Sequence, residues 1–309
     1  MSEPQRVFLT GASGFVGSHV LRELLAAGYE VDALARPGAK LPDGARRVAG
    51  DLRAAGAFAR ELEGCRYVVH CAALYSLAGH RRREIAAVNV EGTAGLLLAA
   101  HLAGVDRVVL TSSSATLGHA DGGYHRSKLD QERAAFAARV PVIALLPTAP
   151  VGPGDWKPTP TGKLVLDFAR GKIGAKAPGH GGMNVVAVED VARAHVAALQ
   201  RGRTGERYVI GGEDLSLDEL WAMLAEITGR SMPKWRAPYA LALAAGYADE
   251  LRSAVTRKEP AVPLEGVRMS RLRMYADSSK AAGELGYRAM PVKAALTRAV
   301  EWYRSNGYA

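Results

Sequence analysis

A tyrosine and a lysine four residues apart are the pair in this 309-residue chain best suited to acid–base chemistry. They begin and end the segment Tyr124-His125-Arg126-Ser127-Lys128, which opens a predicted helix, so both side chains are expected on one helix face. A phenol has an ordinary pKa of about 10 and exchanges protons poorly near neutral pH. Because a neighbouring ammonium favours the phenolate, Lys128 is predicted to tune Tyr124 as a general acid and base.

Hydroxyl groups precede this pair at the end of a predicted strand. The run Thr111-Ser112-Ser113-Ser114-Ala115-Thr116 follows the strand, and only Ala115 to Gly123 separate the serines from Tyr124. A serine hydroxyl at such a place can hydrogen-bond the oxygen on which a reaction takes place. We therefore expect a site built from one serine, Tyr124 and Lys128.

A glycine-rich turn lies between the first predicted strand and the first predicted helix. Three glycines permit a tight turn and a close approach of the backbone to a pyrophosphate, while the helix N-terminus supplies unpaired N–H groups and partial positive charge. The sequence there is Thr10-Gly11-Ala12-Ser13-Gly14-Phe15-Val16-Gly17. The residues predicted to bind a dinucleotide in this turn are Gly11, Ser13, Gly14, Phe15, Val16 and Gly17.

The end of the second predicted strand should decide which dinucleotide is bound. An acidic residue would hold the adenine ribose hydroxyls of NAD, but Ala35-Arg36 occupies this place. A guanidinium can pair with the additional phosphate of NADP, and Lys40 can assist. NADP is therefore predicted, with NAD as the second choice; alternatively, Arg36 stacks on the adenine or points to solvent. Asp32 comes too early and, by strand alternation, faces the other way.

Short apolar runs alternate with alanine- and leucine-rich helical stretches through the first half of the chain. This pattern predicts an α/β fold with a doubly wound parallel sheet, the Rossmann fold. Helices are expected from Gly17 to Ala27 and from Ile85 to Ala103. The predicted strands are Arg6 to Thr10, Glu30 to Ala35, Arg46 to Ala49, Tyr67 to Cys71, Arg107 to Thr111, Val142 to Leu146 and Arg207 to Ile210.

After Pro147 the alternation gives way to a segment rich in proline and glycine. We expect a dinucleotide-binding domain made of residues 1–150 and 184–212. A smaller C-terminal lobe, made of residues 151–183 and 213–309, is expected to bind the substrate.

Together these motifs resemble the extended short-chain dehydrogenases/reductases of the NAD-dependent epimerase/dehydratase family. The matching residues are Gly11, Gly14 and Gly17, then Asp51-Leu52, His70-Cys71-Ala72-Ala73, the serine cluster, Tyr124 and Lys128. The resemblance covers nearly the whole chain and implies catalysis by Ser113, Tyr124 and Lys128. It further implies cofactor contacts from Asp51, Leu52, Cys71, Ala72, Ala73, Thr111, Tyr124, Lys128 and Pro147.

Within this family the chain is most similar to hopanoid-associated sugar epimerases and dihydroflavonol 4-reductase-like proteins, notably through Lys157-Pro158-Thr159-Pro160-Thr161-Gly162. Alignment with different subfamilies selects different serines of the cluster as the catalytic one. Counting from Thr111 as in the reductases selects Ser113, whereas counting as in galactose epimerases selects Ser114. Ser113 is our prediction. The link from Ala115 to Gly123 is shorter than the substrate-covering loop usual in extended members.

The resemblance implies an NAD(P)-dependent oxidoreductase that transfers a hydride between the nicotinamide and a carbonyl or alcohol carbon. Two alternatives stay open. One is a nucleotide-sugar epimerase, which oxidises and re-reduces its substrate with no net cofactor turnover. The other is a non-catalytic protein that senses nicotinamide nucleotides. The substrate is expected to be a small molecule in each catalytic case.

The composition of the chain limits which partners and which cellular location are expected. The net charge of +9 includes Arg81-Arg82-Arg83, but the arginines are spread over the chain without a nucleic-acid-binding module, so no nucleic-acid partner is expected. The two cysteines and the scattered histidines, which include His70, His80, His119 and His125, predict no metal site. Neither a membrane span nor a secretory signal is expected, which predicts a cytoplasmic enzyme. The family resemblance adds a homodimer formed through the helices that flank the Tyr124 helix.

Overall fold

Seven parallel strands form the large sheet at the centre of the molecule. The computed structural model describes residues 5–75, 81–118, 123–258 and 260–309, with the backbone only for Gly123 and Tyr124. The strand order is β3-β2-β1-β4-β5-β6-β9, and every neighbouring pair is parallel. The doubly wound prediction is thereby confirmed. The strands are β1 Arg6–Thr10, β2 Glu30–Ala35, β3 Arg46–Ala49, β4 Tyr67–His70, β5 Arg107–Thr111, β6 Val142–Pro147 and β9 Arg207–Ile210.

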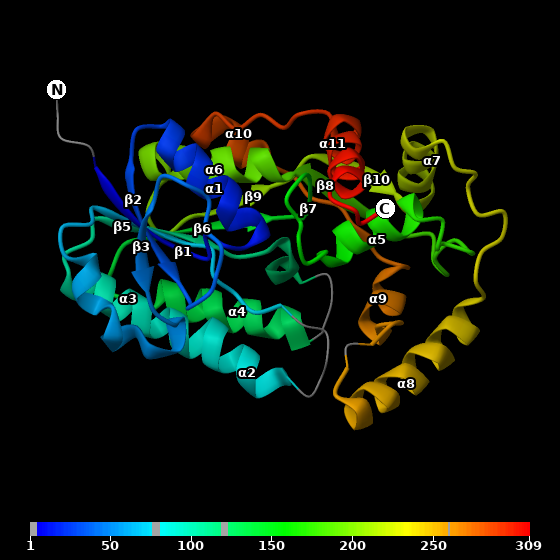
Figure 1. Cartoon of the computed structure of the whole chain (residues 1–309), viewed down its shortest axis with the longest axis horizontal. Coiled ribbons are helices and arrows are strands. Elements are labelled where there is room, and N and C mark those ends of the chain that lie inside the picture. The colour runs from blue at the N-terminus through cyan, green and yellow to red at the C-terminus, as the bar shows by residue number, and fades with distance from the viewer. Residues whose placement is uncertain (1–4, 76–80, 119–122, 259) are drawn as a thin grey trace.

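Helices cover both faces of this sheet (Figure 1). Helices α1 (Phe15–Ala26), α6 (Val188–Arg201) and α10 (Ser279–Leu285) pack on one face, where they enclose one apolar core. The other face is covered by η1 (Leu52–Ala57), η2 (Ala59–Leu62), α3 (Gly92–Leu102) and α4 (Gly123–Phe136), which enclose a second core. Because both faces are covered, the central strands read as nearly continuous apolar runs in the sequence.

The helix expected from Ile85 to Ala103 is not regular along its length. It consists of α2 (Arg82–Ala86), a π-helical turn η4 (Ala87–Glu91) and α3. The stretch Arg82–Leu102 is long and apolar enough to cross a membrane by length and composition alone, but 44% of that window is buried inside the protein. Its contacts with α4 and η1 make it part of the layer that covers the large sheet.

A smaller sheet forms the centre of the second lobe. Its order is β10-β8-β11, and β7 also pairs with β8. Helices α5, α7 and α11 enclose an apolar core with it, whereas α8 and α9 extend away from that core (Figure 1). The elements are β7 Ala149–Val151, β8 Gly182–Ala187, β10 Glu213–Ser216, β11 Arg273–Met274, α5 Pro160–Ala169, α7 Leu217–Thr228, α8 Tyr239–Thr256, α9 Leu264–Met269 and α11 Val292–Ser305.

Two segments depart from the lobe boundaries expected from the sequence. Asn184 lies in β8 and therefore in the small sheet, so the chain returns to the large sheet only with α6. Conversely, α10 lies within the range 213–309, yet its Ala281 and Leu285 are buried in the core of the large sheet. The chain thus passes between the two cores more often than a simple two-part division implies.

Parallel pairing brings several predicted site residues to one edge of the large sheet. Thr10 at the end of β1 is level with His70 at the end of β4, and His70 is level with Leu110, next to Thr111 at the end of β5. Ligands of doubly wound sheets bind at the carboxyl ends of the strands. This edge is where the candidate site has to be assembled.

Candidate functional site

The glycine-rich turn after β1 is too tightly folded to accept side chains at two of its glycines. Gly11 has a φ of +81°, and a Cβ atom there would lie 2.6 Å from the Ala72 nitrogen. A Cβ atom on Gly17 would lie 2.1 Å from the Gly11 carbonyl oxygen. The backbone of the turn is thus packed directly against the end of β4 and the first turn of α1.

The same turn leaves an anion-binding helix terminus. Gly14 is the N-cap of α1, and among the described residues no side chain caps this end and none in its first turn is acidic. The first amides of a helix lack partners within the helix and carry partial positive charge. A pyrophosphate fits such a terminus. Of the other predicted contacts in this turn, Ser13 is exposed, whereas Phe15 and Val16 are half-buried.

The end of β2 presents an exposed guanidinium rather than a carboxylate. Arg36 follows the strand directly and is exposed. The Asp32 carboxylate is buried and accepts hydrogen bonds of 2.7 and 2.8 Å from the Arg46 side chain. As strand alternation predicts, Asp32 is turned away from the site and is not free to bind a ribose.

Asp51 and Leu52 lie at the start of η1, close to the end of β3. The Asp51 carboxylate accepts hydrogen bonds from the Arg53 backbone nitrogen and side chain, and these bonds lower the pKa of Asp51 to about 2. The nearby charge of Arg36 acts in the same direction. Leu52 is buried. The carboxylate is therefore ionised and held in a fixed orientation close to the end of β3.

Cys71 follows β4, where it contacts Thr111 at the end of β5. The Thr111 hydroxyl lies 3.2 Å from the Cys71 sulfur and 2.8 Å from Nε2 of His195. Burial raises the pKa of the Cys71 thiol to about 12 and lowers the pKa of His195 to about 4. Both groups are therefore uncharged near neutral pH, so Cys71 borders the site without being a reactive thiolate.

The serine cluster separates into side chains with different partners. Ser112 is buried, and its hydroxyl donates a hydrogen bond of 2.6 Å to Oε2 of Glu132. Ser113 is the N-cap of η5 (Ser114–Leu117), and its oxygen accepts from the Ala115 nitrogen at 3.2 Å. Because a hydroxyl has one proton to donate, Ser113 can still donate to a substrate oxygen. Ser112 has committed its proton to Glu132.

Lys128 carries a buried ammonium group at this edge of the sheet. The residue is 2% exposed. Its Nζ donates hydrogen bonds of 2.8 Å to the Thr111 carbonyl oxygen and 2.7 Å to Oε1 of Gln131. Burial lowers the pKa of Lys128 to about 8. An ammonium group has three protons, so these two acceptors leave one for a ligand or for a further residue of the site.

Tyr124 lies in the first turn of α4, four residues before Lys128; the described part of the chain includes its backbone but not its side chain. His80 and His119 lie outside the described residues. The neighbouring His125 is buried, and its Nδ1 lies 2.5 Å from Oε1 of Glu265 in α9. This contact joins the start of α4 to the second lobe.

Four buried polar residues around Lys128 were not predicted from the sequence. Gln131 and Glu132 follow Lys128 by three and four positions on α4, whereas Asn89 and Thr93 come from the helix that packs beside it. Arg207 of β9 completes the group through a contact of 2.7 Å with Glu132. The sequence did contain one signal for two of them: Gln131 and Glu132 are polar residues expected on the same helix face as Lys128, a candidate catalytic residue.

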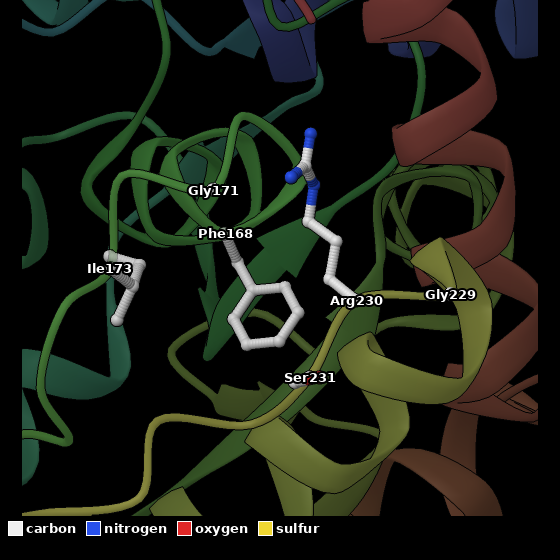
Figure 2. A pocket seen from close by; sticks show the side chains of 6 residues that line it. All are labelled: Phe168, Gly171, Ile173, Gly229, Arg230 and Ser231. Carbon is white, nitrogen blue, oxygen red and sulfur yellow. The ribbon is translucent and has the colours of Figure 1, made fainter.

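A separate pocket lies in the second lobe, between the ends of α5 and α7 (Figure 2). The Phe168 ring and the Arg230 side chain line it. Nε of Arg230 donates a hydrogen bond of 2.7 Å to the Ala169 carbonyl oxygen. None of its described lining residues belongs to the predicted site, so this pocket takes no part in the arrangement around Lys128.

Comparisons with known proteins agree with this geometry. A protein of Synechocystis named "Putative dihydroflavonol 4-reductase" is 38% identical, with 97% of this chain and 95% of that protein covered. Sterol demethylase protein B of Methylococcus capsulatus is 33% identical, with 97% and 98% covered. The crystal structure of gox2253 is 35% identical and superimposes with a TM-score of 0.85, with 98% and 99% of the two chains covered.

The family model agrees with these relatives over the part of the chain that carries the site. Residues 7–211 match the model of the NAD dependent epimerase/dehydratase family. This range begins in β1, includes the glycine-rich turn and Lys128, and ends just after β9. The chain therefore belongs to the NAD dependent epimerase/dehydratase family and is an NAD(P)-dependent oxidoreductase of the extended short-chain dehydrogenase/reductase type.

Proposed function

We propose that this enzyme is an NADP(H)-dependent reductase that converts a carbonyl group of a small molecule to an alcohol with Ser113, Tyr124 and Lys128. The observation that carries the proposal is the ammonium of Lys128. It is buried at the carboxyl edge of the large sheet, bonded to the Thr111 carbonyl oxygen and four residues from Tyr124. The 38% identity to the protein named "Putative dihydroflavonol 4-reductase" supports the direction of the reaction.

The residues present fit a dinucleotide. The crowded backbone at Gly11 and Gly17 and the uncapped N-terminus of α1 suit a pyrophosphate. The exposed Arg36 suits the additional phosphate of NADP, since Asp32 is committed to Arg46. When bound, the nicotinamide supplies the hydride that reduces the carbonyl carbon.

The protein's own groups act on the carbonyl oxygen. Ser113 donates a hydrogen bond to this oxygen, and Tyr124 gives it a proton as negative charge develops there. Lys128 places a positive charge beside Tyr124 and makes the proton transfer easier. In the reverse direction, the same three residues remove the proton of an alcohol.

We further propose that the enzyme is a homodimer in the cytoplasm. Exposed apolar side chains on the outer surface of α3 and α4 support the dimer: Leu98 is 59% exposed, Leu102 76% and Phe136 37%. Two free cysteines, one of them fully buried, fit a reducing compartment.

The decisive experiment combines cofactor binding with substrate conversion. Purified protein is titrated with NADPH and with NADH, and the absorbance of the reduced nicotinamide is then followed while ketones, aldehydes and nucleotide sugars are added. Net oxidation of NADPH by a carbonyl compound is the expected result. Conversion of a nucleotide sugar without net oxidation of NADPH would instead identify an epimerase, an activity that the family description also includes. Failure to bind either cofactor would overturn the proposal.

A further inference from the structure

A chain of buried side chains connects the glycine-rich turn to Lys128. It starts at Thr10, whose Oγ1 accepts a hydrogen bond of 3.2 Å from the Ala72 nitrogen and lies 2.6 Å from Nδ1 of His70. Nε2 of His70 lies 2.8 Å from Oγ1 of Thr93. Thr93 in turn lies 2.9 Å from Nε2 of Gln131.

The direction of each hydrogen bond in this chain follows from chemistry. The Thr93 hydroxyl has one proton, which it donates to the Asn89 carbonyl oxygen at 2.6 Å, because a carbonyl can only accept. The Thr93 oxygen must therefore accept from Nε2 of His70. Burial lowers the pKa of His70 to about 3, so the ring is neutral and Nδ1 is an acceptor. The Thr10 hydroxyl donates to it.

The same reasoning fixes the orientation of the Gln131 amide. Its nitrogen has to face the Thr93 oxygen, which can only accept at that point, and its oxygen then faces the Lys128 ammonium at 2.7 Å. The reverse orientation would direct the amide N–H₂ group at an ammonium and the amide oxygen at a hydroxyl that has already spent its proton. Gln131 is 1% exposed, so bulk water is not an alternative partner.

We propose that Gln131 is a positioning residue for Lys128, and that its amide oxygen holds the ammonium in the charged, correctly placed form because Thr93, His70 and Thr10 fix the amide. The proposal rests on the proposed function only in that Lys128 serves catalysis there. It adds a residue that touches neither the cofactor turn nor the serine cluster but acts through Lys128.

Other titratable groups also surround Lys128. Burial opposes its ammonium form, and Glu132 on its own helix favours that form, whereas the Cys71 thiol at the end of β4 is neutral. His70 lies behind Gln131 and is neutral. Gln131 therefore supplies a neutral acceptor at a place where burial alone would favour loss of the proton.

The test measures the protonation of Lys128 directly in the protein without cofactor. The protein is produced with lysine labelled with ¹³C and ¹⁵N, and heteronuclear NMR between pH 6 and 11 gives the pKa of Lys128, with the exposed Lys172 as internal reference. The proteins compared are the wild type, Gln131→Met and Gln131→Glu. The control is Gln200→Met, which makes the same chemical change at an exposed position of α6.

The two Gln131 variants should move the Lys128 pKa in opposite directions. Gln131→Met removes the acceptor and should lower the pKa by about one unit, a tenfold change in the protonation equilibrium. Gln131→Glu keeps an acceptor, adds negative charge and should raise it. The alkaline limb of the pH profile for carbonyl reduction should shift in the same directions. Gln200→Met should leave the pKa unchanged.

Equal Lys128 pKa values in the three proteins, or shifts of the same sign in both Gln131 variants, would overturn the proposal. A role in folding alone would not give opposite signs. If Gln131→Met fails to fold, as seen by circular dichroism, the sign of the Gln131→Glu shift decides. The NMR titration needs no substrate, so this outcome is independent of the proposed function, which fails separately if Lys128→Met retains full turnover.

Discussion

Lys128 is buried, whereas the other lysines of the chain are half-buried or exposed. Burying an ammonium group is costly unless its protons have acceptors, and Lys128 has two acceptors from the protein. A fold that buries an ammonium at the carboxyl edge of a doubly wound sheet, where ligands of such sheets bind, is expected to use the charge. The chemistry assigned to Lys128 and Tyr124 can therefore be tested by removing single functional groups.

Tyr124→Phe removes one hydroxyl, and Lys128→Met removes one charge with little change in volume. Each should lower kcat by about 100- to 10,000-fold, the range typical of a positioned acid–base group. Steady-state oxidation of NADPH with the carbonyl substrate found in the panel measures the effect. Lys172→Met, at an exposed position, is the matched control and should retain the wild-type rate. Turnover within tenfold of wild type in both site variants would contradict the assignment.

Arg36 offers a test of cofactor choice. Arg36→Ala should weaken NADPH binding about tenfold or more, because a charge-assisted contact with the additional phosphate is lost, and should leave NADH binding unchanged. Fluorescence titration with both cofactors measures this. Arg22→Ala, which removes an exposed arginine from α1, should affect neither cofactor. Equal weakening of NADPH and NADH by Arg36→Ala would mean that Arg36 does not select between them.

At the scale of elements, the turn between β1 and α1 depends on glycine for space. In Gly17→Ala, the new Cβ would lie 2.1 Å from the Gly11 carbonyl oxygen, so the turn has to move. A loss of about 1–3 kcal/mol in unfolding free energy and at least tenfold weaker NADPH binding are expected. Urea denaturation and cofactor titration measure both effects.

Gly283→Ala provides the control for this change of one methyl group. Gly283 lies within α10, and nothing lies within 4 Å of the place where its Cβ would be. Alanine should be neutral there or stabilise the helix by up to about 1 kcal/mol. If Gly17→Ala behaves like Gly283→Ala, the turn is more adaptable than its contacts indicate.

The elements that the sequence predicted are those with local signals. The central strands of the large sheet, such as β1, β2 and β5, are largely buried and appear as short apolar runs, so their positions could be predicted within a residue or two. The π-helical turn around Asn89 could not be predicted, since the Asn89 side chain bonds to the backbone of Leu74, 15 positions away, and such a contact leaves no periodic signal in the sequence. The short strands of the small sheet pair only with distant segments and carry little periodicity.

The candidate site shows the same division. The sequence predicts Tyr124 and Lys128 from their spacing and Ser113 from the family resemblance, and these assignments stay predictions. The role of Gln131 could not be predicted, because its partner Thr93 is 38 positions away in the chain. Hydrogen-bond direction depends on which group has already donated its proton, and this becomes visible only when all members of the chain are in place.

At the scale of the whole molecule, two buried neutral histidines should make stability depend on pH. Burial lowers the pKa of His70 to about 3 and that of His195 to about 4, against an ordinary value near 6.5. Their stabilising contribution is full above pH 6.5. As the pH falls below 6.5, the unfolded chain takes up protons that the folded protein does not, and stability decreases by up to about 1.4 kcal/mol per pH unit for each histidine.

Urea denaturation at pH 7 and pH 5 tests this dependence. Between pH 7 and pH 5, the unfolding free energy of the wild type should decrease by about 2 kcal/mol for each of the two buried histidines. The decrease should be smaller for His195→Asn, since this variant lacks one of the two histidines. His180→Asn changes an exposed histidine and should behave like the wild type. An equal loss in His195→Asn and wild type would show that His195 does not contribute.

The proposed homodimer makes a prediction at the same scale. Leu98→Glu places a charge on the exposed apolar surface of α3 and should convert a dimer of about twice 32.7 kDa into a monomer. Light scattering during size-exclusion chromatography measures the mass. Leu251→Glu changes a leucine of similar exposure on α8 and should remain dimeric. A wild-type protein that is already monomeric would exclude this interface.

The repeated passage of the chain between its two cores limits how new specificities can arise. The chain leaves the large sheet after β6, returns with α6, leaves after β9, returns with α10 and leaves again with α11. No single contiguous segment of the described chain therefore contains the second lobe. Recombination with a relative could not exchange the second lobe as one contiguous segment; changes in this lobe have to be acquired by individual substitutions or by small loops within a shared scaffold.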